Sequence, residues 1–156
     1  MRRAFVLVAM LCCGVATSFA LGSRAKVDMD SLVNGRCWSF RPVTMQNPDI
    51  GTTRDIYQYN VFLNLDGSNV QVQMPVEWVS MSIFTEEFET QAVNYSATFV
   101  DGQYWRILFT LRYNNVSWSV EVAAEPATGR VDVAIVAAEG VMRYVGAFYA
   151  LKREKE

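Results

Sequence analysis

The sequence predicts an all-β protein, an antiparallel meander barrel or closed sandwich of about eight strands with a short N-terminal helix. Apolar and polar side chains alternate with a period of two over most of the chain, as in strands that bury one face. Turn-forming pairs separate these runs, and the clearest are Asp66-Gly67, Asp101-Gly102 and Asn114-Asn115. Aromatic residues make up 13% of the chain and hydrophobic residues 51%, which suits the half-buried surface of a sheet.

The chain divides into one domain and its flanking segments. Its 156 residues match a single domain that buries roughly two thirds of its unfolded surface. We expect a signal peptide at residues 1–20, a short helical segment at 21–35, one β domain at 36–151 and a charged tail at 152–156. Asn34-Gly35 supplies a stop signal for the helix.

The central element is a hairpin over residues 57–74, in which apolar and polar residues alternate on both sides of the turn. The side chains expected on its apolar face are Tyr57, Tyr59, Val61, Leu63, Leu65, Val70, Val72 and Met74. Further strands are expected over residues 37–43, 91–99, 105–112, 116–122, 131–135 and 141–151. Pro42 is expected to end the first of these, residues 45–56 to form a loop, and residues 85–89 to form one acidic turn of helix.

Residues 141–151 are apolar on both faces. A strand that is covered on both sides lacks the alternation of a half-exposed one. We therefore expect the N-terminal helix to pack on the outer face of this last strand. Trp38, Trp105 and Trp118 lie on regular apolar faces and are expected in the core.

The first residues have the pattern of an export signal. Arg2 and Arg3 precede a short apolar run, and small residues at Ser18 and Ala20 suit cleavage after Ala20. We therefore expect an exported protein, periplasmic or secreted. A lipoprotein acylated at Cys13 or Cys12 is the alternative, although the preceding residues fit that signal poorly. No later run approaches the about 20 apolar residues of a transmembrane helix.

Composition excludes several kinds of chemistry. The chain has no histidine, so it lacks the commonest general base and the usual imidazole metal ligand. Without residues 1–20 it holds 12 basic and 16 acidic side chains, a net charge of −4, which argues against binding nucleic acid or anionic lipid. Cys37 is then the one cysteine in the folded part and is expected to be buried as a small hydrophobe. We expect no metal and no cofactor.

The carboxylates give an alternative function. A carbohydrate-active enzyme would need two of them in acid and base roles, and the candidates are Glu86, Glu87, Glu89, Asp101, Glu121 and Asp132. Their positions fit a solvated turn and outward-facing strand sites, and their spacing lacks the pattern of a calcium loop. The sequence therefore favours a protein that is not an enzyme.

Several of these features together resemble a family of small exported proteins from Bacteroides-like gut bacteria that is classed as a domain of unknown function. The likeness spans about residues 30 to 150. Its motifs are Arg36-Cys37-Trp38-Ser39-Phe40, Trp105-Arg106-Ile107, Gly129-Arg130-Val131 and Met142-Arg143-Tyr144-Val145-Gly146. Residues 76–79 depart from the Tyr-Phe-Gly-Arg of that family. The resemblance implies a bacterial envelope setting and an all-β fold, and it assigns no activity.

The candidate site is the aperiodic apolar segment 76–84, which contains Trp78, Met81 and Phe84. Such a segment either plugs one end of the core or forms a lid or exposed patch, which on a soluble protein marks a ligand or partner site. We expect an exported non-catalytic binding module for a small apolar molecule or a partner protein. A structural component of envelope assembly is the alternative.

Overall fold

The computed structural model describes residues 28–151. The expected signal peptide, both cysteines considered for acylation, residues 21–27 and the charged tail lie outside the described residues. The elements are α1 (Met29–Asn34), β2 (Cys37–Asn47), β3 (Thr52–Asp55), β4 (Phe62–Asp66), β5 (Asn69–Val79), β6 (Ser82–Gln91), β7 (Val93–Val100), β8 (Tyr104–Tyr113), β9 (Val116–Ala124), β10 (Val131–Ala137) and β11 (Gly140–Tyr149).

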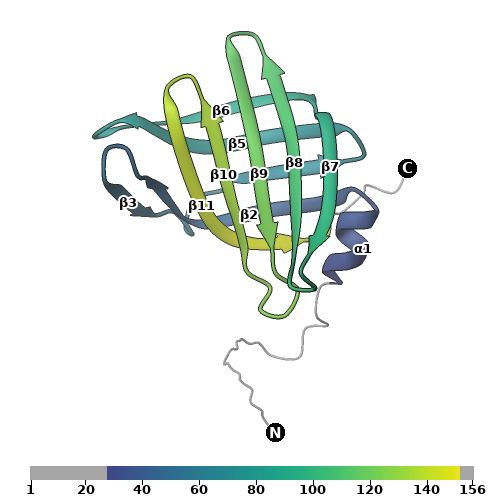
Figure 1. The fold of residues 1–156 in the computed structure, drawn as a ribbon. Coiled ribbons are helices and arrows are strands. Elements are labelled where there is room, and N and C mark those ends of the chain that lie inside the picture. Colours follow the sequence, from purple (N-terminus) through teal and green to yellow (C-terminus); the bar gives the residue numbers. More distant parts are fainter. Residues whose placement is uncertain (1–27, 152–156) are drawn as a thin grey trace, which may run out of the picture.

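The described chain is an antiparallel all-β domain with one short N-terminal helix, as predicted. Its strands form one sheet in the order β6-β5-β4-β2-β11-β10-β9-β8-β7, with β3 paired to β2. Two details of the prediction are wrong, because the sheet has ten strands rather than eight and is not closed. Strands β6 and β7 are its two ends, and although Ala92 alone separates them in the chain, they run in different directions (Figure 1).

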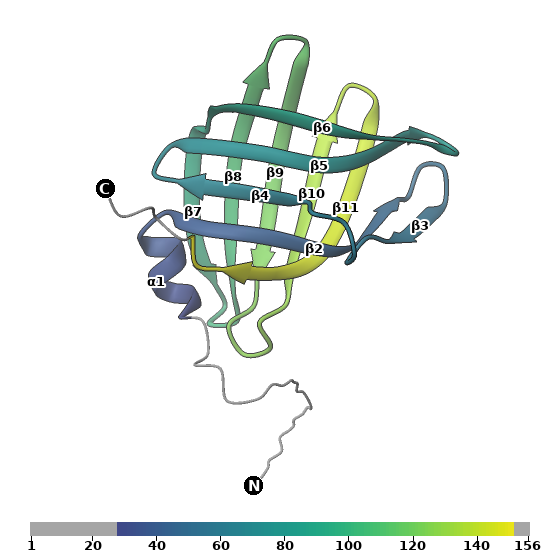
Figure 2. The ribbon, with the colours of Figure 1, turned by 180° about the vertical axis from the view of Figure 1, so that it is seen from behind.

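The sheet folds over itself into two layers. Strands β6, β5, β4 and β2 cross β7 to β10 at a steep angle, and β11 bends to join both layers (Figures 1 and 2). The bend coincides with a register shift between Val145 and Gly146 against β2. A Cβ atom at Gly146 would lie 2.1 Å from the carbonyl oxygen of Arg41, so only glycine allows this close crossing.

The core lies between the two layers and is closed at one end by α1. Trp38 and Trp118 are buried in the core as predicted, whereas Trp105 is half-buried and its indole nitrogen donates a 2.7 Å hydrogen bond to Asp30 of α1. Met29 and Val33 of α1 belong to the same core cluster. With six residues, this helix is far too short to cross a bilayer.

The helix does not pack on the outer face of the last strand. It contacts β2 and lies at the end of the sheet where β2 begins (Figure 1). There its apolar side chains complete a core that the open sheet would otherwise expose. The outer face of β11 is partly exposed instead, with Val145 and Ala147 half-buried and Tyr149 46% exposed.

Three local expectations are wrong because strand pairing overrides local signals. Strand β2 continues through Pro42, which pairs with Gly146 at the bulge, one of the places where a sheet tolerates proline. The expected loop 45–56 contains the end of β2 and β3. The expected helical turn 85–89 lies within β6, where Phe88 is buried and Glu87 and Glu89 face outward.

The central hairpin is confirmed from Phe62 onward. Strands β4 and β5 bury Leu63, Leu65 and the alternating apolar residues of β5. The first tyrosines are the exception, since Tyr57 is 70% and Tyr59 59% exposed. A turn in which the Tyr59 N–H donates to the Ile56 carbonyl oxygen at 3.0 Å ends the alternation before β4 begins. These two side chains are therefore surface groups and not core.

Candidate binding surface

The predicted site segment forms the tip of the β5–β6 hairpin. Val76 pairs with Phe84 and Val79 with Ser82, and the register shifts between these pairs. The extra residues make a bulge that contains Glu77 and Trp78. Met81 lies in the turn with a φ of 68°, in the left-handed region. The segment thus comprises the end of β5 with its bulge, the turn and the start of β6. Val76 is buried in the core, and residues 79–84 are exposed.

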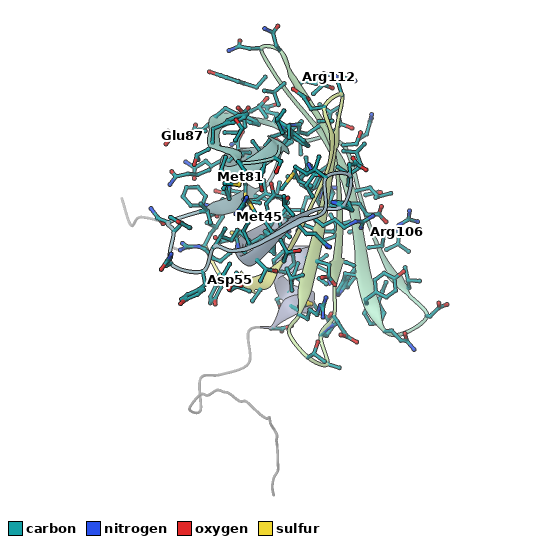
Figure 3. All side chains as sticks on the ribbon, turned by 90° about the vertical axis from the view of Figure 1, so that its left-hand side faces the viewer. Met45, Asp55, Met81, Glu87, Arg106 and Arg112 are labelled. Atoms are coloured by element: carbon teal, nitrogen blue, oxygen red, sulfur yellow. The ribbon has the colours of Figure 1, made fainter. Side chains whose placement is uncertain are left out.

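Four apolar side chains of this tip are exposed to solvent. Met81 is 82% exposed, Val79 67%, Ile83 49% and Phe84 45%, and we call these four residues the tip patch. Figure 3 looks onto this end of the molecule, where Met81 is labelled. Ile83 and Phe84 are neighbours on β6 and face opposite sides of the hairpin, so the tip patch covers both sides of the tip. Large exposed apolar groups of this kind mark contact sites on protein surfaces.

Trp78 lies at the base of the tip rather than on its surface. It is half-buried and packs against the core. Its Cε3 atom is 3.9 Å from the place of a Cβ at Gly140, the first residue of β11. Of the three predicted residues, Met81 and Phe84 therefore belong to the exposed patch, whereas Trp78 is half-buried against the core.

A partly buried ion pair, absent from the sequence prediction, holds the tip. The Glu77 side chain is 1% exposed and that of Arg54, on β3, is 32% exposed. Arg54 Nε donates to Glu77 Oε1 at 2.9 Å and Arg54 Nη2 to Glu77 Oε2 at 2.7 Å. This two-point geometry gives the strongest kind of ionic hydrogen bonding. Glu77 Oε2 also accepts the backbone N–H of Met81 at 2.7 Å.

The end of β2 joins the same cluster. Asn47 is 1% exposed; its Nδ2 donates to the Glu77 carbonyl oxygen at 2.7 Å, and its Oδ1 accepts the Asp49 N–H at 2.9 Å. We call Asn47, Arg54, Glu77 and the Met81 N–H the Glu77 network. It ties three strands and the tip turn into one unit.

The Glu77 network keeps the carboxylate ionised down to acidic pH. Hydrogen bonds from Arg54, with smaller contributions from the Met81 N–H and Thr52, lower the pKa of Glu77 to about 2 against the opposing effect of burial. The ionised carboxylate accepts hydrogen bonds from Arg54 and from the Met81 N–H, and these contacts hold the tip. The sequence holds one signal of this ion pair, a single acid inside the apolar run Val76-Glu77-Trp78-Val79. Such an acid indicates a buried carboxylate with a basic partner, but the sequence does not show that the partner is Arg54.

The carboxylates considered for catalysis lie mostly apart. Glu86, Glu87 and Glu89 follow one another on β6, and Asp101 is in the turn after β7. Glu121 and Asp132 do share a shallow surface hollow of about 400 Å³. Arg106 binds Glu121 at 2.9 Å, however, and Arg130 binds Asp132 at 3.1 Å. Within residues 28–151, no three acidic or cysteine side chains are grouped to hold a metal ion.

A comparison with solved structures finds a protein with a similar fold. The chain shares its fold with a DUF4251 family protein. That protein comes from Bacteroides eggerthii, and the two structures superpose with a TM-score of 0.66 over 79% of this chain and 85% of the other, at 11% sequence identity. The resemblance to a Bacteroides-type domain of unknown function is thus confirmed through the fold. No family model and no curated protein matches the sequence.

Proposed function

We propose that this protein is an exported, non-catalytic binding module that docks a partner protein through the tip patch. The observation that carries the proposal is the exposure of four apolar side chains, 45% to 82%, on a turn whose backbone is held by a buried carboxylate. Full burial of each such side chain contributes about 1.5–3 kcal/mol. Docking would therefore remove an exposed apolar surface that folding leaves uncovered.

The Glu77 network supports docking by fixing the tip in advance. Met81 has a left-handed backbone conformation that non-glycine residues rarely adopt. The hydrogen bond from its N–H to Glu77 and the ion pair to Arg54 hold that conformation. A surface that is already ordered loses less conformational entropy on binding.

The shape of the tip favours a protein over a small apolar molecule. The tip of β5 and β6 lies next to β3, at the opposite end of the molecule from α1, and extends beyond β11 (Figures 1 and 2). Small ligands bind in concave sites that cover most of their surface. A projecting hairpin suits a groove or a strand of a larger partner.

Strand β6 suggests how the partner would bind. It is an end strand of the sheet. Its second half lies against β8, where Thr90 Oγ1 donates to the Arg112 carbonyl oxygen at 2.7 Å, and the outer edge of its first half is available to an added strand. Ile83 and Phe84 are followed on the same strand by Glu86, Glu87 and Glu89. The fitting partner segment is an extended one that combines apolar residues with basic ones, because it would then match both the patch and the acidic half of β6.

The test compares one double variant with a single-substitution control. Met81→Asp with Phe84→Asp should abolish binding. Val136→Asp should not, because Val136 is about as exposed as Phe84 (48% against 45%) but lies on β10. A protein retained from envelope extract by the parent and by Val136→Asp would be purified and its affinity measured by calorimetry. Equal affinity for the double variant would refute the proposal. If native mass spectrometry instead shows a small apolar ligand on the parent protein and none on the double variant, the tip patch binds a small ligand and not a partner protein.

Export rests on the N-terminal pattern and has its own test. The mass of the mature protein should begin after Ala20 if ordinary cleavage occurs. A mass beginning at Cys13 or Cys12 with added acyl chains would make the protein a lipoprotein, anchored rather than free.

A further inference from the structure

A groove of about 690 Å³ lies on the outer face of the sheet and shares no residue with the tip patch. This volume is within the range of about 300–1,000 Å³ that ligand sites occupy. The residues that line the groove are Ser39, Arg41, Pro42, Val43, Tyr57, Tyr59, Val61, Asn64, Gln71, Tyr149, Ala150 and Leu151.

The floor of the groove is a row of side chains across four paired strands. Tyr149 of β11 pairs with Ser39 of β2, Ser39 with Asn64 of β4, and Asn64 with Gln71 of β5. Paired residues project from the same face of a sheet. The row therefore presents two hydroxyls and two amides side by side on the outer face, between the segment 57–61 and the end of β11.

The exposed tyrosines form one wall. Tyr57 is 70% exposed and Tyr59 59% exposed, and both line the groove. The segment 57–61 that carries them is hydrogen-bonded to β5, because Gln73 Nε2 donates to the Asn60 carbonyl oxygen. Two large aromatic side chains are thus held at the surface beside a polar floor, although neither contributes to the core.

The polar groups of the floor include an acceptor without a donor. Asn64 Oδ1 is buried and accepts no hydrogen bond from the described residues, while Asn64 Nδ2 donates to Gln71 Oε1 at 3.4 Å. Buried polar atoms are rarely left unsatisfied. Because this oxygen is buried, a ligand hydroxyl reaches it only if the Asn64 side chain rotates toward the groove.

Arg41 is the one charged side chain among the lining residues. Its Nε donates to Ser39 Oγ at 3.1 Å, and its guanidinium carbon lies 5.8 Å from the centre of the Phe62 ring. The ion pairs within residues 28–151 involve Arg54, Arg106 and Arg130, so Arg41 has no carboxylate partner there. A planar guanidinium held in this way binds a carboxylate of a ligand through two parallel hydrogen bonds.

We propose that this groove binds an acidic oligosaccharide. The apolar ring faces of the sugars lie against Tyr57 and Tyr59, because sugar C–H groups are attracted to the negative face of an aromatic ring. Hydroxyl groups meet the side-chain amides of Asn64 and Gln71, and a uronate carboxylate meets Arg41. No Asp or Glu lines the groove, so it lacks the paired carboxylates that cleave glycosidic bonds, and the sugar is bound and not hydrolysed.

The test uses the mature full-length protein and a defined set of hexasaccharides. The acidic members are oligogalacturonate, oligomannuronate and hyaluronan, and the neutral members are cellohexaose and maltohexaose. Calorimetry should find at least one acidic member bound at least tenfold more tightly than the neutral ones. Tyr57→Ala with Tyr59→Ala should weaken this binding at least tenfold, and Arg41→Gln should remove the preference for the acidic sugar.

Two controls keep the result specific to the groove. Tyr113→Ala removes another exposed tyrosine, 42% exposed and outside the groove, and should leave the affinity unchanged. The double variant Met81→Asp with Phe84→Asp should also leave the affinity for the sugar unchanged. Failure of sugar binding and failure of partner docking are therefore distinguishable. Amide chemical shifts of the unmutated protein should change around residues 57–64 and 149–151 when the sugar is added.

Three outcomes would overturn the proposal. The first is no binding of any acidic member at millimolar concentration. The second is binding that survives loss of both tyrosines. The third is a pattern of amide shift changes centred away from the groove. Because this measurement uses the unmutated protein, it tests the proposal even if the tyrosine variant does not fold.

Discussion

Glu77 and Arg54 lie 23 positions apart in the chain and meet in a two-point ion pair beneath the β5–β6 tip, with N–O distances of 2.9 and 2.7 Å. Arg54 is on β3, a short strand that pairs only with β2 among the described strands. The ion pair therefore connects β3 to β5 through side chains where no backbone ladder does. It is the link between a peripheral strand and the candidate docking surface.

Removing one partner of this pair should destabilise the protein more than removing a surface pair. Arg54→Met leaves the Glu77 carboxylate buried without its counter-charge, which is strongly unfavourable. Glu121→Gln breaks the Arg106–Glu121 pair, whose side chains are 49% and 51% exposed, and should cost about 0–1 kcal/mol. Urea denaturation of both variants measures the difference. Equal losses would mean that the Glu77 network contributes no more than a solvated contact.

Acid should weaken the protein through Glu77. Its folded-state pKa of about 2 is below the ordinary value of 4.5, so the folded state binds the proton less readily than the unfolded state. The resulting stability is present above pH about 4.5 and is lost as the pH falls toward 2. Glu77→Gln should flatten the dependence of melting temperature on pH in this window. If the melting temperature of Glu77→Gln falls with pH as steeply as that of the parent, Glu77 is not the source of the acid sensitivity.

Trp78 and Met81 should respond differently to substitution. Trp78→Ala removes a half-buried indole that packs on the core and should cost about 2 kcal/mol, less than the 3–5 kcal/mol of a fully buried one. Met81→Asn should keep stability within about 0.5 kcal/mol, since Met81 is 82% exposed and asparagine tolerates its positive φ. Thermal unfolding of both variants checks this. A large loss in Met81→Asn would place that side chain in a structural role.

Gly146→Ala should be among the most damaging single substitutions. Its Cβ would lie 2.1 Å from the Arg41 carbonyl oxygen and 2.7 Å from Pro42 Cα, so two strand backbones must separate where β11 bends. We expect a loss of at least about 3 kcal/mol. Gly129→Ala is the matched control, since its Cβ meets nothing within 4 Å and only the φ of 78° opposes it, at about 1–2 kcal/mol. Similar losses in both would show that the crossing can relax.

Local patterns in the sequence determined the hairpins, the helix and most of the core. Asp66-Gly67, Asp101-Gly102 and Asn114-Asn115 all lie at turns between paired strands, where Gly67, Asp101, Gly102 and Asn114 have positive φ values. The helix ends at Asn34 before Gly35, as its stop signal predicted. These features depend on neighbouring residues, which is why a single chain is enough to predict them.

The tertiary structure decided what depends on distant partners. Thr85 to Glu89 became part of a strand because β5 pairs with it, and Glu77 could be buried because Arg54 reaches it from another strand. Tyr57 and Tyr59 alternate as core residues would, yet a turn at Ile56 brings them to the surface beside a polar strand face. Alternation indicates that one face of a strand is apolar. Which face meets the core is decided only when the sheet folds over itself at Gly146, because only then do remote strands define an inside and an outside.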